Sequence, residues 1–222
     1  ARRGLEVFLV ETTHPGLQIP AYYTIVPGAH FRERSRNTGV LMFAAKHAAE
    51  ALEPAEAAAA LERIDAALPG RYFMKFYLGL VRLRAGEPQA ALAHFRHALE
   101  LDPDPAETPS IYSYLGVASK ECGRFDEALE FLRRGLEIDP ERTDLHNLMG
   151  FCHFKLGEHE EAVAAFRRAV ELDPSSAIDY ANLGVNYQAL GETAKARDCY
   201  RLALRLDPGI DFARARLSQL EP

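Results

Sequence analysis

The sequence predicts an all-α protein in which helical hairpins stack as a right-handed solenoid, with a short two-stranded β segment before the stack and a capping helix after it. Three observations predict this fold. Small residues and prolines recur at one spacing along most of the chain, each recurring block holds two helix-length apolar patterns separated by a glycine, and strand-like sequence is confined to the first 37 residues.

The composition allows a sizeable core and excludes several functions. The chain has 222 residues, 48% of them apolar, and a net charge of −6. No apolar run approaches the roughly 18 residues of a membrane span, and the negative charge disfavours general nucleic-acid binding. Three cysteines cannot form a complete disulfide set, so we expect a reducing, cytoplasmic location without membrane attachment. The three cysteines are Cys122, Cys152 and Cys199.

The repeat is visible in columns of equivalent residues. Gly79, Gly116, Gly150 and Gly184 are separated by 37, 34 and 34 residues, which indicates a 34-residue unit with one three-residue insertion. Other columns keep these steps: Gly86, Gly123, Gly157 and Gly191; Ala91, Ala128, Ala162 and Ala196; Phe95, Leu132, Phe166 and Tyr200; Ala98, Gly135, Ala169 and Ala203; and Pro103, Pro140, Pro174 and Pro208.

Each column has a mechanical reason, which the third unit illustrates. Gly157 suits the left-handed conformation that ends a helix, and Pro174 ends the second helix because it lacks an N–H group. Gly150 is small where two helices must approach closely, and Phe166 fills the space between hairpins. The unit is therefore a helix, a turn and a second helix, which must stack on neighbours to cover its apolar face.

The four units resemble tetratricopeptide repeats (TPR). They span 72–105, 109–142, 143–176 and 177–210, and together cover residues 72–210. The sequence departs from the family pattern in one column, where the usual large aromatic before the first glycine is absent. Lys75, Tyr112, His146 and Tyr180 stand there.

Both flanks of the repeats are predicted to be helical. Residues 38–71 keep the hairpin outline, with Val40–Leu52 as a first helix and Pro54 opening a second, and form a degenerate fifth hairpin. Residues 211–222 contain a capping helix whose Phe212, Leu217 and Leu220 are expected to face the last repeat.

The first 37 residues contain a β segment and a linker. Leu5–Thr12 and Ile19–Val26 are rich in β-branched and aromatic residues and are bounded by Pro-Gly pairs, which predicts two strands. The stretch from Leu5 to Phe31 resembles the closing strands of YcaO-type domains. That resemblance implies a neighbouring domain that uses ATP to modify backbone amides, or an accessory factor in ribosomal-protein methylthiolation, but places no catalytic residue in this chain.

In TPR proteins the first helix of each hairpin lines a concave groove, and unit positions two, five, nine and twelve share one stripe. The stripe passes through Ser110, Asp144 and Ile178 and is apolar at its N-terminal end. The predicted partner-binding residues are Phe73, Phe76, Leu80, Ser113, Val117, Lys120, Asn147, Phe151, Phe154, Asn182 and Val185. As an alternative, the N-terminal segments already cover Phe73 and Phe76.

The carboxylate clamp of some TPR domains is missing, because Asn182 is the only matching amide and it has no charge to hold a carboxylate. His94 and His97 have metal-capable spacing but no third ligand, and Cys152 beside His153 points in a different direction from it on a helix. The densest run of positive charge, Arg32 to Arg36, is expected to be a solvated linker.

The leading hypothesis is a non-catalytic scaffold, without cofactor or metal, that holds a protein or peptide segment in its groove. A second hypothesis is a homodimer that positions a neighbouring YcaO-type enzyme domain. A third is a small metal-dependent enzyme built on the histidines.

Overall fold

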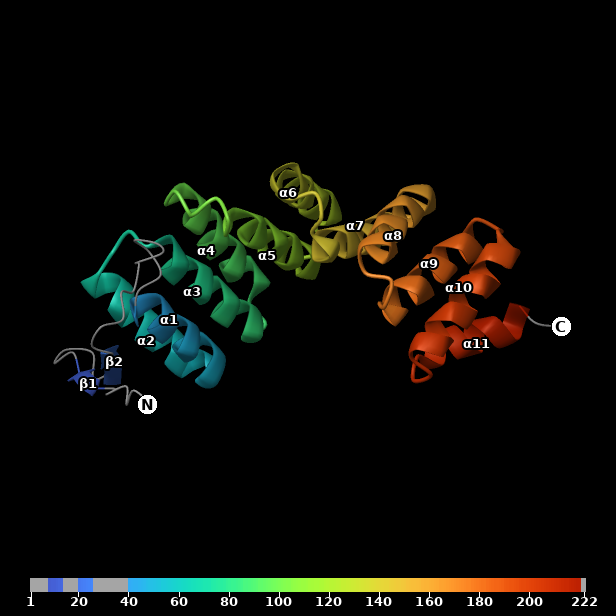
Figure 1. The fold of residues 1–222 in the computed structure, drawn as a ribbon. Coiled ribbons are helices and arrows are strands. Elements are labelled where there is room, and N and C mark those ends of the chain that lie inside the picture. Colours follow the sequence, from blue (N-terminus) through green and yellow to red (C-terminus); the bar gives the residue numbers. More distant parts are fainter. Residues whose placement is uncertain (1–7, 14–19, 26–39, 221–222) are drawn as a thin grey trace, which may run out of the picture. The chain divides into compact units, whose positions relative to one another are not determined.

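A computed structural model describes residues 8–13, 20–25 and 40–220, which hold eleven helices and two strands (Figure 1). The chain divides into two compact units, residues 1–103 and residues 104–222. The arginine run from Arg32 to Arg36 lies outside the described residues, as do residues 5–7, 14–19 and 26–31 of the YcaO-like stretch.

The first unit contains the strands and four helices. Its elements are β1 (Phe8–Thr13), β2 (Pro20–Ile25), α1 (Val40–Ala51), α2 (Pro54–Ala67), α3 (Tyr72–Arg84) and α4 (Pro88–Glu100). The strands pair antiparallel, with Phe8 opposite Ile25 and Thr13 opposite Pro20. Helices begin at Val40 and Pro54, as the sequence predicts, and Pro54 stands in the first turn, where its missing N–H costs nothing.

Helix α1 is attached to the first repeat by an arginine. The guanidinium of Arg84, at the end of α3, donates to the backbone carbonyls of Ala49 and Leu52, the latter at 3.1 Å. These carbonyls lie at the C-terminus of α1, where no intrahelical N–H is available to bond them. Both α1 and α2 pack against α3, so the first repeat has helices on more than one side.

The second unit contains three helix pairs and a last single helix. They are α5 (Thr108–Glu121) with α6 (Phe125–Ile138), α7 (Thr143–Leu156) with α8 (His159–Leu172), α9 (Ala177–Ala189) with α10 (Thr193–Leu206), and α11 (Asp211–Leu220). Each first helix packs most extensively on the second helix of its own pair, and each second helix packs on the first helix that follows. The grouping into units that begin at 72, 109, 143 and 177 stays a prediction.

Each pair is closed by a large side chain that lies on a glycine. A Cβ atom added to Gly150 would lie 2.8 Å from the ring of Phe166, and one added to Gly184 would lie 2.7 Å from Tyr200. Such distances are shorter than van der Waals contact. The recurring glycine is therefore required because the ring of the second helix occupies the volume of a side chain on the first. Phe166 packs within its own hairpin as well as against Leu183 of the next.

The second glycine column ends the first helices as predicted. Gly157 has a φ of +79° and is the C-cap of α7, and its N–H donates to the carbonyl of Phe154. The same left-handed conformation recurs in the other members of this column. It is strained for residues that carry a Cβ, which explains the choice of glycine.

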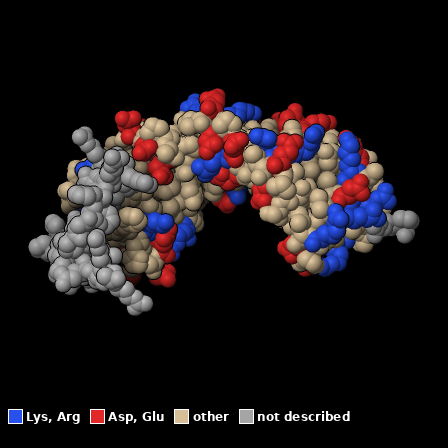
Figure 2. Space-filling view, in the orientation of Figure 1, with Lys and Arg blue, Asp and Glu red and all other residues tan. Residues whose placement is uncertain are grey.

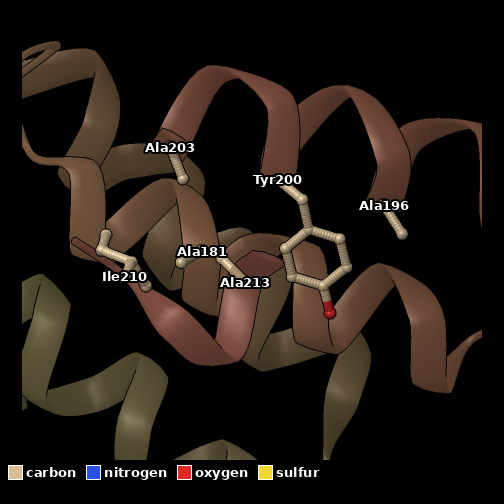
Figure 3. Packing of buried hydrophobic residues seen from close by; sticks show 6 residues of the cluster. All are labelled: Ala181, Ala196, Tyr200, Ala203, Ile210 and Ala213. Carbon is tan, nitrogen blue, oxygen red and sulfur yellow. The ribbon is translucent and has the colours of Figure 1, made fainter. Parts of the chain in front are cut away.

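The last pair and α11 enclose one core cluster (Figure 3). Tyr200 is fully buried among alanines of three helices, and its hydroxyl donates to Gln188 at 3.0 Å. Leu217 and Leu220 pack against this cluster, as the sequence predicts for a capping helix. The prediction for Phe212 is wrong, because its side chain is 42% exposed. Ala213, one residue later and about 100° around the helix, takes the buried position.

We predict that Gly150→Ala destabilises the protein by roughly 1–3 kcal/mol, although alanine is the better helix former, because the added methyl group overlaps the ring of Phe166. Urea unfolding followed by circular dichroism measures the change.

The matched test is a double-mutant cycle with Phe166→Ala. In that background the ring is absent, so Gly150→Ala is expected to be neutral or stabilising. An equal loss of stability in both backgrounds would contradict the proposed contact.

Candidate functional site

A groove of about 580 Å³ runs across the first helices of the second unit. Residues of α5, α7 and the start of α9 line it, so it lies on the successive first helices (Figure 1). Its lining residues are Ser110, Ser113, Tyr114, Val117, Arg142, Thr143, Asp144, Asn147, Leu148 and Asp179.

An ion pair at the start of α7 forms one wall of the groove. Arg142 binds Asp144 through two bonds, Nε to Oδ1 at 2.8 Å and Nη2 to Oδ2 at 2.9 Å. The pair reaches back to α5, since Arg142 also donates to Ser110 at 3.2 Å and Ser113 donates to Asp144 at 2.8 Å. Partial burial raises the pKa of Asp144, but the bonds from Arg142 and Ser113 outweigh it and hold this pKa below its ordinary value. Asp144 is therefore charged at neutral pH.

A second carboxylate lies beneath the groove surface. Asp179 is only 2% exposed and accepts hydrogen bonds from Asn147 and, at 2.7 Å, from Ser176. Burial raises the pKa of Asp179, and the two hydrogen bonds counteract that effect only in part. The α7 and α9 helices are thus joined through a buried acid next to the groove.

The stripe continues along α7 as an aromatic surface with cationic neighbours. The ammonium groups of Lys120 and Lys155 lie 5.1 and 5.3 Å from the ring centroid of Phe151, and Lys155 lies 5.8 Å from that of Phe154. Both rings are half-buried. This surface can hold apolar groups, and its lysines favour acidic ones nearby.

The structure brings part of the predicted stripe together. Ser113, Val117 and Asn147 all line the groove. Asn182 and Val185 lie on α9, half-buried and outside the groove lining.

The N-terminal end of the stripe lies in the first unit and differs in burial. Phe73 is 3% exposed, so it belongs to a core and not to an accessible surface, consistent with the packing of α1 and α2 on α3. Phe76 and Leu80 are half-buried, and the ring of Phe76 lies 5.8 Å from that of Phe95.

Arg142 and Asp179 are site residues that the sequence reasoning missed. Arg142 is the last residue of the second predicted unit, and Asp179 stands at position three of the fourth unit, next to the stripe. Position three is apolar in the two preceding units, Ile111 and Leu145, so an acid there is the signal that could have identified Asp179.

Two asparagines of the predicted stripe take part in hydrogen bonds within the repeats. Asn147 donates its amide to Asp179. The backbone carbonyl of Asn182 accepts from Asn186 at 2.9 Å, which ties this position into the α9 helix.

Cys152 has the properties of a packing residue. It is fully buried, and burial raises the pKa of its thiol to about 11, despite an opposing effect of Lys120. Its neighbour His153 binds Glu158 through Nδ1 at 2.6 Å. The thiol is therefore protonated at neutral pH, and the adjacent imidazole is engaged elsewhere.

His94 lies half-buried on α4, and burial together with Arg82 and Lys75 lowers its pKa. Within the part of the chain that the structure describes, no three His, Cys, Asp or Glu side chains are close enough to hold a metal ion. None of the helices described is long and apolar enough to cross a membrane.

Comparison with protein families identifies the repeat. Family profiles described as tetratricopeptide repeat match residues 44–106, 82–150, 121–185 and 177–210. The chain belongs to the tetratricopeptide repeat family. The TPR matches confirm the repeats predicted from the glycine and alanine columns and extend upstream to residue 44, into the helices that precede the first predicted unit. None of the curated proteins matches the chain.

Solved structures share the fold at low sequence identity. The crystal structure of YrrB, described as a TPR protein with an unusual peptide-binding site, has 21% identity and a TM-score of 0.68, and the match covers 79% of this chain and 89% of YrrB. MamA has 21% identity and a TM-score of 0.65 over 70% of this chain and 89% of its own. A TPR protein from Cytophaga hutchinsonii has 14% identity and a TM-score of 0.71 over 81% and 69%.

We predict that the stability of the Asp179→Asn variant relative to wild type increases as the pH rises. The raised pKa means that the folded state prefers the neutral acid, so wild-type stability falls between the ordinary carboxyl pKa of about 3.9 and the raised value. Asparagine has no such loss.

The free energy of unfolding is measured for both proteins from pH 3.5 to 7.5. The difference between them should grow in favour of the variant as the pH rises and then reach a plateau. Asp126→Asn, at an exposed acid of α6, is the control. A difference that is constant with pH would contradict a raised pKa at Asp179.

Proposed function

We propose that the protein is an interaction scaffold that binds a polypeptide segment of a partner in the groove of the second unit. TPR proteins as a class supply such scaffolds, and the first TPR domain of Spaghetti, solved with an HSP90 peptide, shares the fold with 24% identity and a TM-score of 0.50 over 51% of this chain and 90% of its own. The observation that carries the proposal is the groove itself, in which side chains of three successive repeats converge.

The chemistry of the groove favours a segment with mixed character. Ser113 and Asn147 lie among charged groups, while Val117 and Phe151 provide apolar contact one helical turn further along. Arg142 and Asp144 neutralise each other, so the wall offers directional hydrogen bonds without net charge. A peptide with backbone or polar groups over the wall and an apolar side chain over Phe151 fits this arrangement.

The same geometry argues against an acidic C-terminal tail as the occupant of the groove. The groove has no pair of free cations aimed at one point, since the guanidinium of Arg142 is held by Asp144 through two bonds. Bidentate recognition of a carboxylate needs two parallel N–H groups of a guanidinium, and those of Arg142 are already bound to Asp144. The proposed occupant is therefore an internal segment of a protein, recognised along several residues.

We predict that Val117→Arg abolishes peptide binding, because the half-buried valine lines the groove and a long charged side chain would fill it. Twelve-residue peptides selected from a random phage library on the wild-type protein serve as probes, and fluorescence polarisation measures their affinity. A loss of at least about tenfold is expected, as for a central contact residue.

The matched control is Ala164→Arg, which places the same side chain on an exposed position of α8 away from the groove. Asn147→Ala is a second groove variant that adds no bulk. The proposal is wrong if selected peptides bind Val117→Arg and Asn147→Ala proteins as tightly as wild type, with thermal unfolding showing all variants folded.

A second candidate function rests on the N-terminal segment. The pairing of β1 with β2 provides an antiparallel hairpin within the stretch that resembles the end of a YcaO-type domain. In this proposal the repeats dimerise and position such an enzyme domain in the cytoplasm, where the three thiols of the chain stay reduced.

Sedimentation over a hundredfold range of concentration separates the two candidates. We predict a single monomeric species for the peptide-binding scaffold, since the repeats bury their cores within each chain. A concentration-dependent dimer would instead support the second candidate.

A further inference from the structure

Positive charge gathers at the C-terminal end of an otherwise acidic protein. Residues 193–220 contain six Lys and Arg against three Asp and no Glu, whereas the whole chain has a net charge of −6. Figure 2 shows the blue side chains concentrated over the α10 and α11 helices. The earlier repeats do not show this concentration of positive charge.

Two columns of the repeat change sign in the last unit. Arg205 of α10 stands where the three earlier units carry Glu100, Glu137 and Glu171. Lys195 stands where the two preceding units carry Glu127 and Glu161. Since the earlier second helices fold with acids in these columns, the fold does not require the basic residues of α10.

The basic residues border a groove of about 530 Å³ between α10 and α11. Arg201 and Arg205 are exposed at its edge, and Leu204 and Leu217 provide a partly buried apolar floor. Arg205 and Arg216 form no ion pair with any residue that the structure describes. Asp198 is the one acidic residue in the lining. We call this surface the terminal groove.

The repeat itself shows what kind of element fits the terminal groove. One repeat earlier, the equivalent positions Arg167, Val170, Glu171 and Leu183 line a similar groove. There the opposite wall is α10, which contributes Lys195, Asp198 and Cys199. An amphipathic helix therefore occupies the equivalent place against the preceding repeat. Within the described chain, α11 has no second helix of its own.

The charges across the earlier groove define the charge that a helix seated on the terminal groove would need. Glu171 and Lys195 line opposite walls and have opposite sign. In the terminal groove the equivalent of Glu171 is Arg205, so a helix seated there would need an acid where α10 has Lys195. An equivalent aromatic ring is not accommodated, because Ser218 replaces the glycine on which Tyr200 lies in the preceding pair.

We propose that the terminal groove binds an acidic amphipathic helix of a partner protein, which packs small apolar residues on Leu204 and Leu217 and places carboxylates on Arg201 and Arg205. The bound helix extends the solenoid by one element. It lies on the terminal groove in the place that α10 takes at the equivalent groove one repeat earlier. The apolar floor and Asp198 favour such a helix over a nucleic-acid backbone or an anionic membrane, both of which present uninterrupted negative charge.

Two labelled peptides with the sequence of α10 test the proposal. Both carry Cys199→Ala and Tyr200→Ala, and the acidic peptide also carries Lys195→Glu, Arg197→Glu, Arg201→Glu and Arg205→Glu. Fluorescence polarisation with the full chain should show saturable binding of the acidic peptide, weakened by 0.5 M salt in the buffer, and no binding of the basic peptide.

The protein variant Arg201→Glu with Arg205→Glu should lose at least about tenfold in affinity for the acidic peptide and gain affinity for the basic one. The matched control, Arg133→Glu with Arg134→Glu on exposed positions of α6, makes the same charge change and should bind like wild type. Circular dichroism checks that both variants stay folded.

Three results would overturn the proposal. The first is equal binding of the acidic peptide to both double variants, and the second is no binding of this peptide to wild type. The third is binding of a twenty-nucleotide oligothymidine or of phosphatidylserine vesicles that is tighter than that of the acidic peptide and depends on Arg201 and Arg205. Loss of binding to the groove variant Val117→Arg would instead assign the peptide to the other site.

Discussion

The fold depends on the close approach of two helices at one glycine in each pair. Phe166 and Tyr200 lie where the Cβ atoms of Gly150 and Gly184 would be, so the second helix of each pair is fixed in position on the first. Fully buried alanines on both sides of each ring leave room for it and keep the helices at one distance. Because this contact repeats, successive first helices come to lie side by side, and a groove forms across them.

The groove is organised before any partner arrives. Hydrogen bonds join α5 to α7 through Ser113 and Asp144, and α7 to α9 through Asn147 and Asp179. These bonds hold the side chains of three repeats in a defined arrangement, which lowers the entropy lost on binding. They also occupy the charged groups of the wall, so recognition relies on shape and hydrogen bonding more than on net charge. Burial raises the pKa of Asp179, so the charged form of this acid is disfavoured in the arrangement.

The terminal groove differs in charge from the groove on α5, α7 and α9. Arg205 lies at a column where the earlier units carry glutamate, whereas Arg201 has an arginine at the equivalent place in each of them. In the preceding repeat α10 lines the opposite wall of the equivalent groove. Within the described residues no helix follows α11, and the terminal groove stays open beside it. A polar capping helix such as α11 covers part of the last repeat, with Leu217 and Leu220 on the core and most other side chains exposed. The two grooves therefore suit partners of different chemistry.

The sequence by itself determined the repeat and the position of the turns, because these follow from spacing along one chain, whereas the partner-binding stripe stays a prediction. Gly157 and Pro174 act locally, and the glycine and alanine columns record a contact that every unit makes. Only the tertiary structure decided which members of the stripe are accessible. Phe73 is buried in the core of the first unit, whereas Phe212 is exposed on α11. Burial and pairing depend on elements far apart in sequence, so the ion pair of Arg142 with Asp144 and the buried acid Asp179 could be placed in the groove only once the helices were packed.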